Sequence, residues 1–167
     1  MDTASQAARE AAVSRIREFT RFYMPTFELL GNHYLGSDYS ATEARVLFEL
    51  YEHNGCNAAH IARATNLDKS YLSRIIRGFE QKGLLTRTAS KTDSRSFALH
   101  LTELGTALTE DFIQKSNRQI GAVIGPLEPE ACQALIGALD TITRILNACG
   151  PTTAAGEESY THENRPL

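Results

Sequence analysis

One stretch constrains the fold of this chain more than any other: residues 67–101, which read LDKSYLSRIIRGFEQKGLLTRTASKTDSRSFALHL. Asp68 is a good N-cap for a helix, and Gly83 stands where a left-handed residue belongs after that helix ends. Residues 84–89 and 97–101 are predicted to be two strands joined by a polar tip. The stretch therefore predicts a helix followed directly by a β-hairpin.

The helix that starts after Asp68 has two chemically different sides. Apolar residues recur at helical spacing and share a buried side: Leu72, Ile75, Ile76 and Phe79. The opposite side carries basic residues and hydroxyl groups: Lys69, Ser70, Tyr71, Ser73, Arg74 and Arg77. A shorter helix, capped by Asn57, precedes it across the three-residue turn 65–67. Two short helices joined by a tight turn, the second with an exposed basic face, predict a helix-turn-helix.

Such a helix presents its N-terminal half to base edges in the major groove of DNA. Arg74 can donate two hydrogen bonds to guanine, and Tyr71 can contact a thymine methyl group. Lys69 and Arg77 are better suited to phosphates. At the hairpin tip, Asp93 can orient the guanidinium of Arg95 for entry into an adjacent minor groove. The alternative for this last pair is a surface ion pair of little energetic value.

The charge distribution agrees with a nucleic-acid partner although the net charge of the chain is −3. From Cys56 to Leu101 the chain has eight basic and three acidic residues, which gives +5 there and −8 elsewhere. A local positive face can bind DNA on an acidic chain. An ordinary mixed surface is the alternative.

Helices are expected on both sides of this lobe. Residues 11–34 keep aromatic and aliphatic residues at a seven-residue step, which favours packing against a second copy, with a bend at Pro25. Ser40 and Glu43 have the spacing of a capping box for the next helix. After the hairpin, two more helices are expected from Thr102 and from Pro129. The first eight residues are expected to fray, and residues 152–167 to be disordered.

The predicted architecture is mainly α: a winged helix-turn-helix with long N- and C-terminal dimerisation helices, in the order α-α-α-α-β-β-α-α. Residues 39–101 would form the DNA-binding lobe, residues 1–38 and 102–149 the dimerisation helices, and residues 150–167 the tail.

These residues carry a family resemblance. The segments NAAHIARATNLDKSYLSRIIRGFEQKGLLTR and TDSRSFALHLTELG resemble the MarR family of transcriptional regulators. The wing motif Asp-x-Arg-Ser stands at residues 93–96, and the motif Leu-Thr-x-x-Gly at residues 101–105. The resemblance implies a homodimer, in most cases a repressor, that binds a pseudo-palindromic operator and often releases it when a small ligand binds.

A narrower resemblance involves FTRFY, YSATEARVLFEL and LDKSYLSRIIRGFE, which look like regulators fused to a GNAT acetyltransferase domain. The chain lacks the glycine-rich acyl-CoA loop of that domain, so acetyltransferase activity is not expected. The sequence is either a stand-alone relative or part of a fusion. The second hypothesis for its function is thus a regulatory module in which DNA binding is weak or lost.

Family effectors usually lie between the dimerisation helices and the DNA-binding lobe. The candidates in this chain are aromatic and basic residues, which could equally be core or interface residues: Tyr23, Phe27, His33, Tyr34, Arg45 and Phe48. Arg45 could pair with an acidic, aromatic effector.

Other kinds of site find less support. His53, Cys56 and His60 suit zinc chemically, but a fourth ligand is not evident and His60 lies on a helix that must pack, so no metal or other cofactor is expected. The three cysteines show no CxxC spacing, and none lies in the first helix, where some family members sense oxidants. We find no GxSxG, P-loop, GxGxxG or HExxH motif and expect no enzymatic activity. Without a signal peptide or a long apolar run, a cytoplasmic location is expected.

Overall fold

The computed structural model describes residues 3–30, 32–89 and 97–149 of the chain. The chain divides into two compact units, Met1–Pro126 and Leu127–Leu167. Within the described residues, no helix is both long and apolar enough to cross a membrane. The elements follow the expected order, with helices before and after a two-stranded hairpin.

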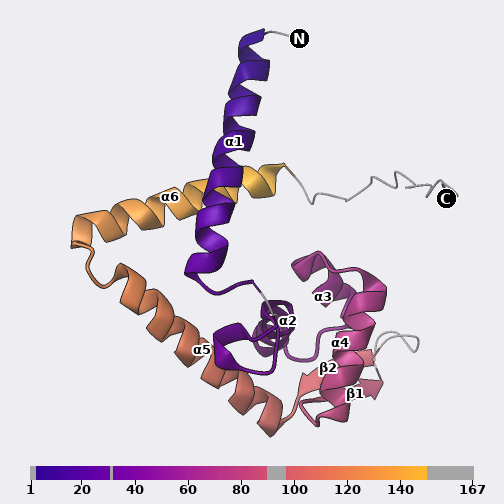
Figure 1. Ribbon diagram of the computed structural model, residues 1–167. Coiled ribbons are helices and arrows are strands. Elements are labelled where there is room, and N and C mark those ends of the chain that lie inside the picture. The colour runs from indigo at the N-terminus through magenta and orange to yellow at the C-terminus, as the bar shows by residue number, and fades with distance from the viewer. Residues whose placement is uncertain (1–2, 31, 90–96, 150–167) are drawn as a thin grey trace, which may run out of the picture. The chain divides into compact units, whose positions relative to one another are not determined.

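The first unit begins with α1 (Thr3–Thr26) and a short 3-10 turn, η1 (Tyr34–Gly36). Helices α2 (Ala41–Glu52), α3 (Ala58–Thr65) and α4 (Lys69–Gln81) follow. Strands β1 (Leu85–Ala89) and β2 (Phe97–Leu101) precede α5 (Glu103–Ile124). Figure 1 shows α2, α3 and α4 grouped with the hairpin.

Local sequence signals set most of these boundaries. Ser40 and Glu43 form the predicted capping box, in which the hydroxyl accepts from the Glu43 N–H and the carboxylate accepts from the Ser40 N–H at 2.8 Å. Asn57 caps α3, and Asp68 caps α4. Gly83 has the predicted positive φ of 70° after α4, and bonds from Gly83 N–H and the next N–H back into the helix close its end.

The expected extent of the first helix was wrong at both ends. It starts at Thr3, so the N-terminal residues are helical rather than frayed, and it ends at Thr26 rather than at Tyr34. Pro25 lies in its last turn, and Glu28 adopts a left-handed φ of 51°. Bonds from Glu28 N–H to Pro25 O and from Leu29 N–H to Met24 O then end the helix as a Schellman motif. The sequence concealed this end because glycine, not glutamate, usually occupies that position.

The hairpin is antiparallel, with Leu85 opposite Leu101 and Ala89 opposite Phe97. The turn between α2 and α3 forms two backbone hydrogen bonds with strand β2. Gly55 N–H donates to Leu99 O at 2.8 Å, and Leu99 N–H donates to Cys56 O at 2.9 Å. These bonds hold the α2–α3 turn against strand β2.

The core of the first unit lies where α2, α3, α4 and the hairpin meet the start of α5. It includes the predicted buried side of α4 together with aliphatic residues of α2 and Phe112 of α5. Burying each such side chain contributes roughly 1.5–3 kcal/mol, so this core fixes how α4 is held.

The second unit contains α6 (Pro129–Ala148), with proline at the tolerated first position of the helix. None of the residues of α6 is buried. Its large apolar side chains are exposed: Leu135, Ile136, Leu139, Ile142, Ile145 and Leu146.

Candidate nucleic-acid interface

Helix α4 has the two-sided character that its sequence predicts. Leu72, Ile75, Ile76 and Phe79 are buried in the core. The six predicted contact residues are all exposed: Lys69, Ser70, Tyr71, Ser73, Arg74 and Arg77. The core therefore supports one side of the helix and leaves the polar side for a partner.

The N-terminus of α4 is held by Asp68. Its carboxylate Oδ1 accepts from the N–H of Ser70 at 2.8 Å and from the N–H of Tyr71 at 3.0 Å. The backbone N–H groups of Tyr71 and Ser70 stabilise the charged form and lower the pKa of Asp68 below its usual value. This cap fixes the first turn, from which Lys69 and Ser70 project.

Three cations on the exposed side of α4 are available to an anionic partner. Within the described part of the chain, Lys69, Arg74 and Arg77 form no ion pair with an acidic side chain. The guanidinium of Arg74 lies 5.4 Å from the centre of the Tyr71 ring, a contact that orients both side chains. Charged groups of this kind on one face suit phosphates and base edges.

Two other basic residues of the lobe are already engaged. Arg87 of β1 donates from Nε to Glu80 of α4 at 2.6 Å, and a second guanidinium nitrogen bonds the other carboxylate oxygen. Lys82 Nζ lies 4.2 Å from the centre of the Tyr39 ring. Both residues belong to the basic segment 56–101, and the sequence alone does not reveal these partners. Of the described lysines and arginines in segment 56–101, Arg87 alone is paired with an acidic side chain, and three of those without such a pair lie on α4.

Asp93 and Arg95, the predicted minor-groove pair, lie outside the described residues. The strands that lead to them are described, and β1 is tied to α4 by the Glu80–Arg87 pair. Their role stays a prediction.

The six candidate effector residues do not gather at one place. Arg45 and Phe48 line a hollow of about 300 Å³ between α2 and α5, together with five residues that the sequence did not suggest: Tyr51, Glu52, Ile113, Ser116 and Asn117. Tyr51 donates a hydrogen bond to Glu110 at 3.1 Å, and this bond raises the pKa of its hydroxyl.

The other candidates have different surroundings. Tyr34 is buried in the core, with its ring 6.0 Å from that of Phe112. His33 is exposed and lies 3.0 Å from the carbonyl oxygen of Ser37. The rings of Tyr23 and Phe27 are 4.9 Å apart beside the end of α1.

Comparison with known proteins gives a consistent result. Residues 39–97 match the model of the MarR family, described as "MarR family". The organic hydroperoxide resistance transcriptional regulator of Bacillus subtilis is 30% identical over 131 residues, which are 78% of this chain and 83% of that protein. A putative transcriptional regulatory protein for the hcr operon of Thauera aromatica is 29% identical over 93 residues, 54% of each chain.

Solved structures share the fold at lower identity. Streptococcus pneumoniae FabT, solved in complex with DNA, has a TM-score of 0.63 at 16% identity, covering 87% of this chain and 99% of that one. Bordetella bronchiseptica BpsR, whose DNA binding is regulated by 6-hydroxynicotinic acid, has a TM-score of 0.62 at 20% identity, covering 80% and 98%.

Proposed function

This chain belongs to the MarR family of transcriptional regulators, and we propose from that premise that it binds double-stranded DNA through α4 and the hairpin. One observation carries the proposal: the exposed side of a core-anchored helix bears Lys69, Arg74 and Arg77 with no acidic partner in the described residues. The proposal includes no catalytic activity. A regulator of this kind acts where the DNA is, which agrees with the cytoplasmic location expected from the sequence.

Each residue of the exposed side has a proposed role. Arg74 and Tyr71 read base edges in the major groove, and the hydroxyls of Ser70 and Ser73 bond bases or phosphates. Lys69 and Arg77 neutralise phosphates. Asp93 and Arg95 at the hairpin tip contact an adjacent minor groove.

We further propose that two copies bind together. Helices α1 and α6 expose large apolar side chains that an isolated soluble chain rarely leaves uncovered over such lengths. A two-fold dimer presents two copies of α4 and binds half-sites one helical turn apart.

The selection of bound fragments from a random DNA pool tests the proposal. The expected product is a two-fold symmetric motif with half-site centres about 10 base pairs apart. The alternative function, a regulatory module that has lost DNA binding, predicts no enriched motif, and that result would refute the proposal.

The hollow between α2 and α5 supports a second element of the function, the binding of a small effector. Arg45 is half-exposed at its edge and has only a 3.5 Å contact with Glu49, so its guanidinium can pair with an added carboxylate. We propose a small aromatic acid as the effector, and release of DNA as its effect.

Aromatic carboxylates should raise the melting temperature of the wild type but not of Arg45→Gln. A panel that neither shifts the melting temperature nor releases DNA would remove the idea.

A further inference from the structure

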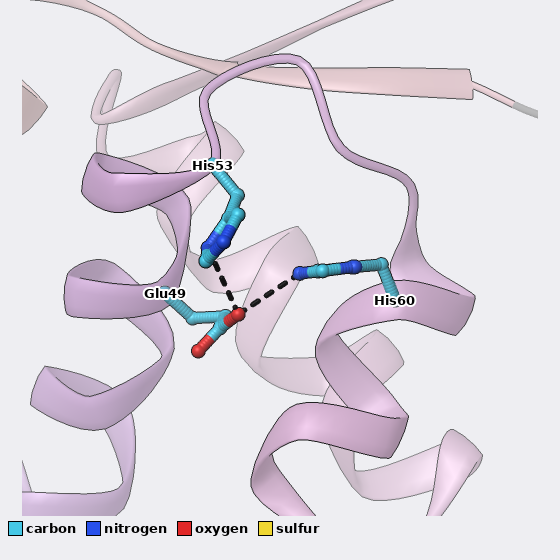
Figure 2. A group of neighbouring side chains, drawn as sticks. All are labelled: Glu49, His53 and His60. Carbon is cyan, nitrogen blue, oxygen red and sulfur yellow. Dashed lines mark hydrogen bonds and ion pairs between the residues drawn. The ribbon is translucent and has the colours of Figure 1, made fainter.

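Three side chains from two helices converge at the turn between α2 and α3. Glu49 lies on α2, His53 is the C-cap residue of that helix, and His60 lies in the first turn of α3. One donor atom from each residue lies within 4.8 Å of the other two. Figure 2 shows both imidazole rings pointing at the carboxylate of Glu49.

Both rings meet the same oxygen of that carboxylate. His53 Nδ1 lies 3.1 Å from Glu49 Oε1, and His60 Nε2 lies 2.9 Å from it. The side chain of Glu49 is only 5% exposed, whereas that of His53 is 50% exposed. A buried carboxylate is costly unless it is paired. The other oxygen of Glu49 lies 3.5 Å from Arg45 Nη2, so this one carboxylate is met by three basic side chains.

The backbone holds these residues in place without help from a ligand. Glu49 and His53 are four residues apart and share one side of α2. The Oδ1 atom of Asn57 accepts from the His60 N–H at 2.9 Å and fixes the first turn of α3. Gly55 has a positive φ of 88° in the tight turn between them and is bonded to Leu99 of β2. The donor set is thus preformed.

We propose that Glu49, His53 and His60 form a zinc-binding site. Two imidazole nitrogens and one carboxylate oxygen are a donor set that zinc uses in proteins, with water in the fourth position. Zinc bonds of about 2.1 Å place tetrahedral donor atoms roughly 3.4 Å apart. The two carboxylate–imidazole separations of 2.9 and 3.1 Å need to widen slightly, and the two imidazole nitrogens, which lie within 4.8 Å of each other, need to settle at about the same spacing.

Hydrogen bonds from the imidazole N–H groups to the carboxylate are the competing explanation for the cluster. The ring centres of His53 and His60 are 4.8 Å apart, so two charged rings would repel each other beside a single carboxylate. A divalent ion supplies the same charge at one point and accepts electron pairs from both neutral rings. The ion would take the place of the two N–H protons that point at the carboxylate, and the zinc titration distinguishes these two explanations.

The third candidate ligand beside the two histidines is Glu49, whereas the sequence suggested Cys56. The metal-competent cluster does not include Cys56, and burial together with the negative charge of Glu49 raises the pKa of its thiol. The sequence did not reveal Glu49 as a partner of His60, because the two residues lie 11 positions apart on different helices.

The test is a zinc titration of the full chain by calorimetry, with any affinity tag removed and Cys132 and Cys149 changed to serine. We expect one zinc per chain and a raised melting temperature. His53→Ala and His60→Ala should each lower the affinity at least about tenfold and abolish the thermal shift.

Matched controls separate ligand loss from damage to the fold. His33→Ala removes an exposed imidazole outside the cluster, and Cys56→Ser removes the neighbouring thiol. Both variants should keep the wild-type affinity. The absence of zinc binding would overturn the proposal, and so would affinity that survives both His53→Ala and His60→Ala or that falls with Cys56→Ser. The zinc titration contains no DNA, so its failure would leave the proposed DNA binding standing.

Discussion

Asp68 is the predicted N-cap of α4, and the capping hydrogen bonds change the pKa of its carboxyl group. The N–H groups of Tyr71 and Ser70 donate to its carboxylate, which lowers its pKa below the usual value. A carboxyl group with a lowered folded-state pKa stabilises the fold above its unfolded pKa, and this stabilisation is lost as the pH falls through the folded value.

Asp68→Ala should therefore lower the free energy of unfolding at neutral pH, and the difference in this free energy between the variant and the wild type should shrink as the pH falls below about 4. Chemical denaturation at several pH values between 7 and 3 measures this difference. Asp68→Asn is the matched control, because asparagine keeps a capping oxygen without a titrating carboxyl group. A gap between Asp68→Ala and the wild type that stays constant down to pH 3 would contradict this account.

The sequence predicted Asp68 as a cap because its partners lie two and three residues away. It could not predict the pairing of Glu80 with Arg87 or of Glu49 with His60. Each of these pairs joins different elements, and its geometry depends on how those elements pack. The exposed face of α4 was predictable from helical periodicity alone. The partners of Glu80 and Glu49 were not, because they lie on other elements.

At the scale of elements, Gly105 shows why the Leu-Thr-x-x-Gly motif ends in glycine. A Cβ atom at Gly105 would lie 2.1 Å from the carbonyl oxygen of Leu84, where the hairpin begins. The same junction is held by Thr102, whose hydroxyl donates to Gly83 O at 2.7 Å and accepts from the Gly105 N–H at 3.1 Å. Helix α5 can approach the residue before β1 this closely only without a side chain at Gly105.

Gly105→Ala should destabilise the chain by about 1–3 kcal/mol, because the backbone of one element must move. Gly121→Ala in the same helix is the matched control, since no atom lies within 4 Å of an added Cβ there. That variant should be neutral or stabilising by up to about 1 kcal/mol through helix propensity. Urea denaturation at one fixed protein concentration measures both. Equal effects of the two substitutions would show that the close approach is unimportant.

Elements were predictable wherever a cap or a glycine lay at the boundary. The starts of α2, α3, α4 and α5 follow Ser40, Asn57, Asp68 and Thr102, as the sequence indicated. The end of α1 was not predictable, because Glu28 takes a left-handed conformation that side chains rarely adopt. The bonds between Gly55, Cys56 and Leu99 also escaped prediction, since they depend on tertiary contacts.

For the whole molecule, the unburied apolar side of α6 is the feature that a second copy would explain. Ile142 is 44% exposed and lies on the same side as Leu135, Leu139 and Leu146. The wild type should be a dimer at micromolar concentration, and Ile142→Glu should shift it towards monomer. Light scattering after size-exclusion chromatography reports the mass.

Gln133→Glu is the matched control for that substitution. It adds the same charge to α6, but helical geometry puts it on the opposite side from Ile142. It should leave the dimer intact. A wild type that is monomeric at micromolar concentration, or a dimer indifferent to Ile142→Glu, would refute a dimer built on this side of α6.

The central claim is that the exposed side of α4 binds DNA, and the affinity of three proteins for one selected duplex tests it most directly. Anisotropy titrations over a range of salt concentrations should show that Arg74→Ala lowers the affinity by about 1–3 kcal/mol, which is roughly 5-fold to 150-fold. Arg118→Ala, which removes an exposed arginine from α5, should match the wild type. Equal affinity of the wild type, Arg74→Ala and Arg118→Ala would contradict the claim.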